Sequence, residues 1–208
     1  MAIKAVVALA ILTLMGAAPS NCTGCDFAKS DLSGRDFSNV RYVGADFKDS
    51  NLRNSRFDNA NLTGVDFTGA DLRGARFDGA NCTGCDLEHT QLTSSARGLF
   101  YHCTGCDARG LDLSGFDLSG ARLIGVDFRD ANLHNVNLKG AAVCWLNHRD
   151  FGADTETDCI DLRDANVTGA DFSGAQICTG RHEDDCRPVD AATLRQYSRS
   201  DLAGARLP

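Results

Sequence analysis

The chain has 208 residues and a formal net charge of −7. Residues 22–143 hold 16 acidic and 13 basic side chains, and residues 144–208 hold 12 and 7, so the acidity is concentrated in the last third. This balance offers no attraction for nucleic acid, and we expect none as a partner.

Residues 1–20 have the features of an export signal. Lys4 precedes an apolar run from Ala5 to Met15, which is too short to span a bilayer comfortably. The small side chains around Pro19 suit cleavage by a signal peptidase. We interpret residues 1–20 as a signal peptide and expect an exported protein, periplasmic or secreted, with no membrane contact after cleavage. A retained anchor and a lipoprotein modified at Cys22 are the alternatives.

The chain up to Val143 follows a period of five residues. The stretch 61–87 reads NLTGV DFTGA DLRGA RFDGA NCTGC DL. Each unit has an apolar residue or cysteine at its centre, with Asp, Asn or Arg usually just before it. The residue two positions before the centre is small in most units. Neither helices nor strands give this period, and a fixed internal repeat indicates a solenoid. The centres are Phe27, Leu32, Phe37, Tyr42, Phe47, Leu52, Phe57, Leu62, Phe67, Leu72, Phe77, Cys82, Leu87 and Leu92.

The pattern A-(D/N)-(L/F)-x-G resembles the pentapeptide-repeat family over residues 22–143 and again over 160–177. The resemblance implies an all-β fold, a right-handed quadrilateral parallel β-helix with four units per coil. Columns of like centres twenty residues apart, such as Phe27 and Phe47, support four units per coil independently. We expect about seven coils and a short C-terminal helical cap. A one-residue excess between Leu92 and Leu113 predicts a bulge or short loop near residues 97–101.

Ten cysteines behind an export signal predict a disulfide framework. Three copies of Cys-Thr-Gly-Cys place two inward sulfurs across one corner of a coil, and a type II turn brings their Cα atoms within disulfide range. Pairing between neighbouring coils is also open for the second and third copies. We favour the corner pairs, because the residues one coil above the first copy are not cysteines. The copies are Cys22 with Cys25, Cys82 with Cys85, and Cys103 with Cys106.

The same spacing permits other chemistry. Cys82, Cys85, Cys103 and Cys106 have the arrangement of a four-thiolate zinc site, but the repeat length generates that spacing automatically. A thiol-redox function would need accessible cysteines, whereas these point into a packed interior. We therefore expect structural disulfides, with no metal and no cofactor.

The repeat register breaks after Val143. Residues 144–159 contain the single tryptophan and are bracketed by Cys144 and Cys159, which we predict to form a disulfide. We interpret this segment as an insertion loop. It is either a tolerated insertion or a binding surface, because loops on rigid scaffolds often carry function. The candidate interaction residues are Trp145, His148, Arg149 and Phe151.

The repeats return over residues 160–177 as a final coil. Cys178 and Cys186 are predicted to pair, and Asp190 should cap a short helix that closes the last edge. The expected organisation is therefore a signal peptide over 1–20, a β-helix over 21–143, the insertion loop over 144–159, the final coil over 160–177, and a cap over 178–208. No cap precedes the first coil, which leaves an end-to-end homodimer as a hypothesis.

No catalytic motif stands out. The five histidines are scattered, and no phosphate loop or nucleophile elbow occurs. We expect a non-enzymatic scaffold or interaction module with a protein partner that the sequence does not identify. The family resemblance adds an alternative, because some members mimic DNA and protect DNA gyrase. That role implies a cytoplasmic, strongly acidic rod, and residues 1–20 and the charge balance argue against both. The zinc or thiol-redox protein is the further alternative.

Overall fold

The structure is a computed structural model that describes residues 19–146, 157–178, 186–200 and 202–208. The described residues fall into two compact units. The first unit ends at His102 and the second begins at Cys103.

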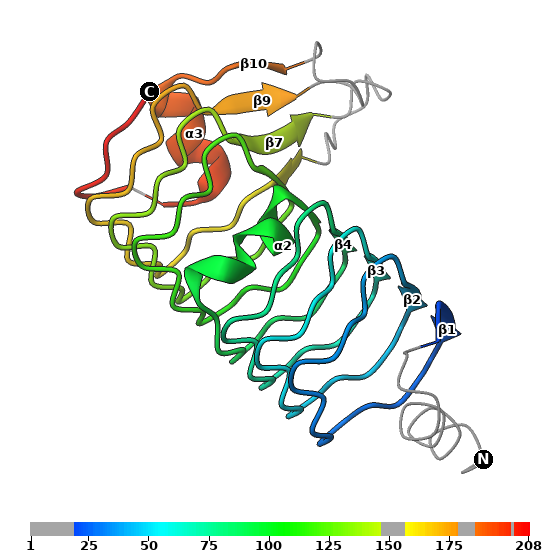
Figure 1. Cartoon of the computed structure of the whole chain (residues 1–208). Coiled ribbons are helices and arrows are strands. Elements are labelled where there is room, and N and C mark those ends of the chain that lie inside the picture. Colours follow the sequence, from blue (N-terminus) through cyan, green and yellow to red (C-terminus); the bar gives the residue numbers. More distant parts are fainter. Residues whose placement is uncertain (1–18, 147–156, 179–185, 201) are drawn as a thin grey trace. The chain divides into compact units, whose positions relative to one another are not determined.

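The first unit is a stack of four-sided coils (Figure 1). One side of each coil is a three-residue strand, and these strands are parallel and in register, with Asn61 opposite Asn81. Single bridges join the other three sides, all between residues twenty apart: Asp26 with Asp46, Asp31 with Asn51, and Asp36 with Arg56. The five-residue period therefore equals one side of a coil. The strands are β1 (Asn21–Thr23), β2 (Arg41–Val43), β3 (Asn61–Thr63) and β4 (Asn81–Thr83).

The interior of the first unit is filled by the centres of the repeats. Phe47 stacks on Phe27 and Phe67 with ring centroids 4.8 and 5.3 Å apart. A second column stacks Phe57 between Phe37 and Phe77 at 4.9 Å on each side. All of these rings are fully buried. The small residue of each unit leaves room for these side chains, which explains why the repeat requires it.

The repeat is interrupted near residues 97–101, as expected, but by a helical segment and not by a bulge or short loop. The chain there forms a 3-10 helix, η1 (Ser94–Arg97), followed by the helical turn α2 (Gly98–Tyr101). Ala96, Leu99 and Phe100 are fully buried, so the helical segment supplies apolar side chains to the interior in place of a repeat unit. Gly98 packs on the backbone carbonyl of Phe77, with no space for a Cβ. An extended bulge would not have provided this packing.

The second unit continues the same architecture. Its bridges first join residues twenty apart, as between Asp107 and Asp127, and then residues 34 apart, as between Asp127 and Asp161. The larger spacing corresponds to the 14 additional residues between Cys144 and Cys159. Strands β7 and β9 are parallel neighbours, and each also pairs antiparallel with the strand that follows it. The strands are β5 (His102–Thr104), β6 (Arg122–Ile124), β7 (Ala142–Leu146), β8 (Thr157–Cys159), β9 (Gln176–Cys178) and β10 (Cys186–Pro188).

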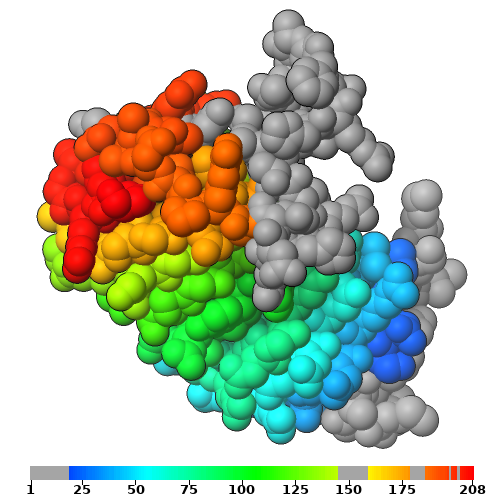
Figure 2. Space-filling view, turned by 90° about the horizontal axis from the view of Figure 1, so that it is seen from above, coloured from blue at the N-terminus to red at the C-terminus, as the bar shows by residue number. Residues whose placement is uncertain are grey.

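The last edge of the second unit is covered by the C-terminal segment. Helix α3 (Ala191–Ser198) begins after Asp190, whose side chain accepts a hydrogen bond from the Thr193 N–H at 2.8 Å, as the sequence predicted. The N–H groups of the final coil donate to this segment, for example from Leu162 to Ser198 at 3.0 Å and from Phe172 to Arg206 at 2.8 Å. Figure 2 shows the segment, orange to red, lying over the final coil.

The fold is thus a parallel β-solenoid with a short helix near its C-terminus, as expected. It has about six turns, close to the number that the sequence predicted. Among the described residues, no helix is long and apolar enough to cross a membrane.

Candidate functional site

Three disulfides lie at corners of the coils. The Cα atoms of Cys22 and Cys25 are 5.9 Å apart, and those of the other two Cys-Thr-Gly-Cys motifs are 5.8 and 6.0 Å apart. Gly24 lies between the first pair with a φ of 62°, a conformation that glycine adopts without strain. These are the corner pairs that the spacing favoured.

The corner sulfurs offer little chemistry to solvent. Cys82, Cys85, Cys103 and Cys106 are each at most 1% exposed. A reactive thiol needs access and a positively charged neighbour, and a disulfide sulfur cannot act as a thiolate ligand. A zinc site made of these cysteines would require both corner disulfides to be broken first.

Two further disulfides close hairpins on the second unit. Cys144 lies directly opposite Cys159 in the antiparallel pair of β7 and β8, and Cys178 lies directly opposite Cys186 in the pair of β9 and β10. Because β7 and β9 are parallel neighbours, the two hairpins leave the same sheet side by side. Each disulfide therefore closes the base of its own hairpin, and Cys144–Cys159 closes that of the predicted interaction loop.

A small cluster of buried apolar side chains lies on the outer face of this sheet. Ile124, Ala142 and Cys178 form a buried cluster against which Cys186 packs. In the first unit the slot that corresponds to Ile124 is occupied by exposed residues such as Thr63. The hairpins thus emerge from a packed base.

The predicted interaction residues are only partly within this description. Trp145 belongs to β7. His148, Arg149 and Phe151 lie outside the described residues.

Carboxylates on the outside of the coils serve the turns of the repeat. The aspartate before each centre accepts a hydrogen bond from the N–H two residues later, as Asp71 does from Arg73 at 3.2 Å. The Arg73 guanidinium also contacts Asp71 at 2.6 Å, and these hydrogen bonds hold the pKa of Asp71 below its usual range. In the second unit, Arg163 contacts Asp161 at 2.6 Å in the same way. The sequence shows these aspartates only as the polar residue that precedes each centre.

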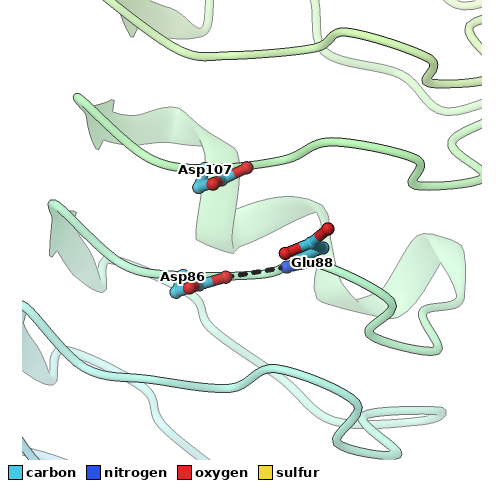
Figure 3. A group of neighbouring side chains, drawn as sticks. All are labelled: Asp86, Glu88 and Asp107. Atoms are coloured by element: carbon cyan, nitrogen blue, oxygen red, sulfur yellow. Dashed lines mark hydrogen bonds between the residues drawn. The ribbon is translucent and has the colours of Figure 1, made fainter.

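Asp86 and Glu88 show the same turn in the first unit. The Glu88 N–H donates to Asp86 Oδ1 at 3.1 Å (Figure 3). Asp107, also drawn there, belongs to the second unit, where its carboxylate contacts Arg109 at 2.6 Å. Each contact is explained by the repeat, and none of them identifies a ligand.

The five-residue period, the four-sided coils and the Asx turns define a pentapeptide-repeat solenoid. The family model for pentapeptide repeats matches this chain in 8 copies, over residues 20–57, 43–79, 55–93 and 102–140. The protein belongs to this family. A search of curated proteins returned no match.

Solved structures share the fold. A trypsin-treated variant of QnrB1, described as a plasmid-mediated fluoroquinolone resistance protein, is 19% identical with a TM-score of 0.60, covering 90% of this chain and 80% of that chain. Full-length QnrB1 is 17% identical with a TM-score of 0.50, covering 90% and 84%. HetL from the cyanobacterium Nostoc is 22% identical over 74% and 71% of the chains, but its TM-score of 0.33 carries no argument. At these identities the likeness shows the fold alone.

Proposed function

We propose that this protein is an exported, non-enzymatic scaffold, stapled by disulfides, that binds a protein partner. The observation that carries the proposal is the state of the cysteines: all ten are paired in the structure. Such a framework is stable in an oxidising compartment and is uncommon in reducing cytosol. The apolar run in residues 1–20 supports export independently.

The pair of hairpins on the second unit is the proposed contact surface. A rigid solenoid that holds two adjacent loops by disulfides presents them at low entropic cost, which favours binding. The pairs Cys144–Cys159 and Cys178–Cys186 lie at the bases of these hairpins. Pentapeptide-repeat proteins are generally structural or interaction proteins, which supports a non-enzymatic role.

The test of export is non-reducing peptide mapping of protein recovered from whole cells, with its N-terminus determined in the same preparation. A start near Asn21 and five intrachain disulfides are expected. An intact Met1 with free thiols would overturn the proposed compartment. It would also restore the zinc and thiol-redox alternatives, which metal analysis would then examine.

The test of the contact surface is crosslinking in intact cells. A photoreactive residue placed at Trp145 should crosslink to a protein partner, and one placed at Thr63 should not. Equal crosslinking from both positions would show that the hairpins are not the binding surface.

A second candidate is a gyrase-binding role. The observation that favours it is the fold shared with QnrB1, a fluoroquinolone resistance protein. The charge argues against it, since residues 19–102 hold 11 acidic and 9 basic side chains and resemble DNA poorly. A supercoiling assay with gyrase and a fluoroquinolone separates the candidates: protection by this protein would support the gyrase role, and no protection would leave the exported scaffold.

A further inference from the structure

Four segments of the chain have the sequence Asn-x-Thr, which is the acceptor motif for N-linked glycans in secreted proteins. The middle residue is not proline in any of them. Other asparagines in the same slot of the repeat, such as Asn51 and Asn137, are followed two positions later by Arg and Lys instead. The motif is therefore a property of particular units and not of the repeat as a whole. The four asparagines are Asn21, Asn61, Asn81 and Asn166.

Asn61 and Asn81 lie directly opposite each other on neighbouring strands of the first unit, at the start of β3 and of β4. Both asparagines are exposed, and so are Thr63 and Thr83, which complete the two motifs. The glycine that follows each threonine has nothing within 4 Å of an ideal Cβ. This side of the first unit therefore has open space beside both motifs.

A hydrogen bond within each of these two motifs polarises the asparagine amide. Thr63 Oγ1 donates to Asn61 Oδ1 at 3.2 Å, and Thr83 Oγ1 donates to Asn81 Oδ1 at 3.3 Å. A donor at the carbonyl oxygen draws electron density from the amide group, so that an Nδ2 proton is lost more easily. Neither Nδ2 group has a hydrogen-bond acceptor among the described residues. Each nitrogen is thus available for a new bond.

Asn166 in the second unit has the same motif in a different environment. Its Nδ2 donates to Asn132 Oδ1 at 3.1 Å, and its Oδ1 accepts from the Thr168 N–H at 3.2 Å. The nitrogen therefore belongs to a ladder of side chains that joins two coils, and a backbone N–H contacts the carbonyl oxygen where the other motifs use a hydroxyl. A saccharide on this nitrogen would disturb the contact with Asn132, although Asn166 is exposed.

We propose that Asn61 and Asn81 are sites of N-linked glycosylation, and that Asn166 is not. The co-substrate is a saccharide carried on a lipid diphosphate, and a transferase joins the two. The asparagine Nδ2 forms a bond to the anomeric carbon of the saccharide and loses one proton. The bond between that carbon and the diphosphate oxygen breaks, and the diphosphate leaves with the electron pair.

This inference rests on the proposed export, because the motif is an acceptor only in chains that leave the cytosol. It adds a modified surface on the first unit to the contact surface proposed for the hairpins. Asn21 adjoins the expected cleavage point and is not part of the inference.

The neighbouring strand supplies a mild way to remove each motif. Val43 of β2 occupies the slot that Thr63 occupies in β3, and the two residues are directly paired. The substitutions Thr63→Val and Thr83→Val therefore remove the hydroxyl at a slot where the fold already accommodates valine. Both asparagines remain in place, so each variant tests the motif and not the presence of the amide.

The test is mass mapping of protein from the cells that make it, after treatment with a peptide N-glycosidase in heavy-oxygen water. This enzyme hydrolyses a glycosylated amide and leaves an aspartate that carries the oxygen label. We expect labelled aspartate in place of Asn61 and Asn81, and unlabelled asparagine at Asn166. Thr63→Val should abolish the label at the first site only, and Thr83→Val at the second only. Thr168→Val is the matched control and should change neither site.

The N-terminus and the disulfides, determined in the same preparation, separate this inference from export. Unlabelled Asn61 and Asn81 in protein that begins near Asn21 and holds five disulfides would overturn the inference and leave export standing. An intact Met1 would overturn both. Either site is overturned on its own if its asparagine stays unlabelled. A label that survives loss of the threonine hydroxyl, or an equal label at Asn166, would also overturn the assignment.

Discussion

Gly69 lies over Asp49 at one corner of the first unit, and a Cβ built on Gly69 would lie 2.6 Å from Asp49 Oδ1. Both residues have positive φ values, 69° and 54°. The carboxylate of one coil thus fills the space that a side chain in the next coil would need. The same relation joins Asn54 to Gly74 and Asn59 to Gly79.

The substitution Gly69→Ala should lower the free energy of unfolding by about 2–4 kcal/mol, since it combines backbone strain with a steric clash. Gly34→Ala is the matched control, because Gly34 has a φ of +67° and nothing within 4 Å. It should cost only the backbone strain, roughly 1–2 kcal/mol. Urea denaturation of oxidised protein measures both. The double variant Asp49→Gly with Gly69→Ala should lose only as much stability as the Gly34→Ala control. If Gly69→Ala and Gly34→Ala alone lose the same stability, the steric explanation is refuted.

Phe57 should be the most sensitive position of its column, because its ring stacks on Phe37 and Phe77 at 4.9 Å on each side. Phe57→Ala should cost about 3–5 kcal/mol through the cavity that it leaves. Phe57→Leu should cost below about 1.5 kcal/mol, since leucine fills equivalent centres elsewhere in the solenoid. Denaturation midpoints test this order, and similar costs for both variants would mean that the stack contributes little.

Loss of the Cys144–Cys159 disulfide should destabilise the second unit. The bond closes a separation of 15 residues, which corresponds to about 3 kcal/mol of unfolded-state entropy. The double variant Cys144→Ser with Cys159→Ser should therefore melt at a lower temperature than the wild type under oxidising conditions. The difference should disappear when both proteins are melted in reductant. A difference that persists in reductant would assign the effect to packing of the sulfurs instead.

Acid should destabilise the protein through its ion-paired aspartates. The pKa of Asp71 lies below its usual range because of hydrogen bonds from Arg73. Partial burial on its own would raise the pKa of Asp161. The hydrogen bonds from Arg163 outweigh the effect of burial, and the net result is a pKa below the usual range. A lowered folded-state pKa contributes stability above the ordinary value of 3.8, and this stability is lost as the pH falls through the folded-state pKa.

Melting temperatures should therefore stay nearly constant from neutral pH down to about pH 5 and fall below about pH 4. In the Asp71→Asn variant, the asparagine side chain can still accept the hydrogen bond from the Arg73 N–H, but it does not titrate. Its melting temperature should be lower than that of the wild type at neutral pH, and the difference should narrow in acid. A difference that is independent of pH would show that the ionised state of Asp71 contributes nothing.

The period of five was enough to predict the coils, because each side of a coil is one unit and each interior column collects residues twenty apart. The period alone places Phe27 and Phe47 in one column, and in the structure their rings stack. The N-cap at Asp190 could be predicted for a similar reason, since capping depends on neighbouring residues alone.

The helical segment at 94–101 could not be predicted from the period. Helices advance about 1.5 Å per residue and strands about 3.3 Å, but an excess of one residue in the coil does not show which of the two the chain forms. Only packing in three dimensions shows that Leu99 and Phe100 then reach the interior. The adjacency of the two hairpins was also hidden, because it depends on β7 and β9 becoming neighbours across a long sequence separation.

The register of twenty residues has a consequence for the length of the molecule. Deleting residues 41–60 would place Asn61 over Asn21, Leu62 over Cys22 and Asp66 over Asp26, so each slot would still meet a residue suited to it. Both ends of the solenoid would be unchanged. The number of coils is therefore a property that gene duplication or deletion can adjust in whole steps, while the first coil, the hairpins and the C-terminal cap are inherited intact.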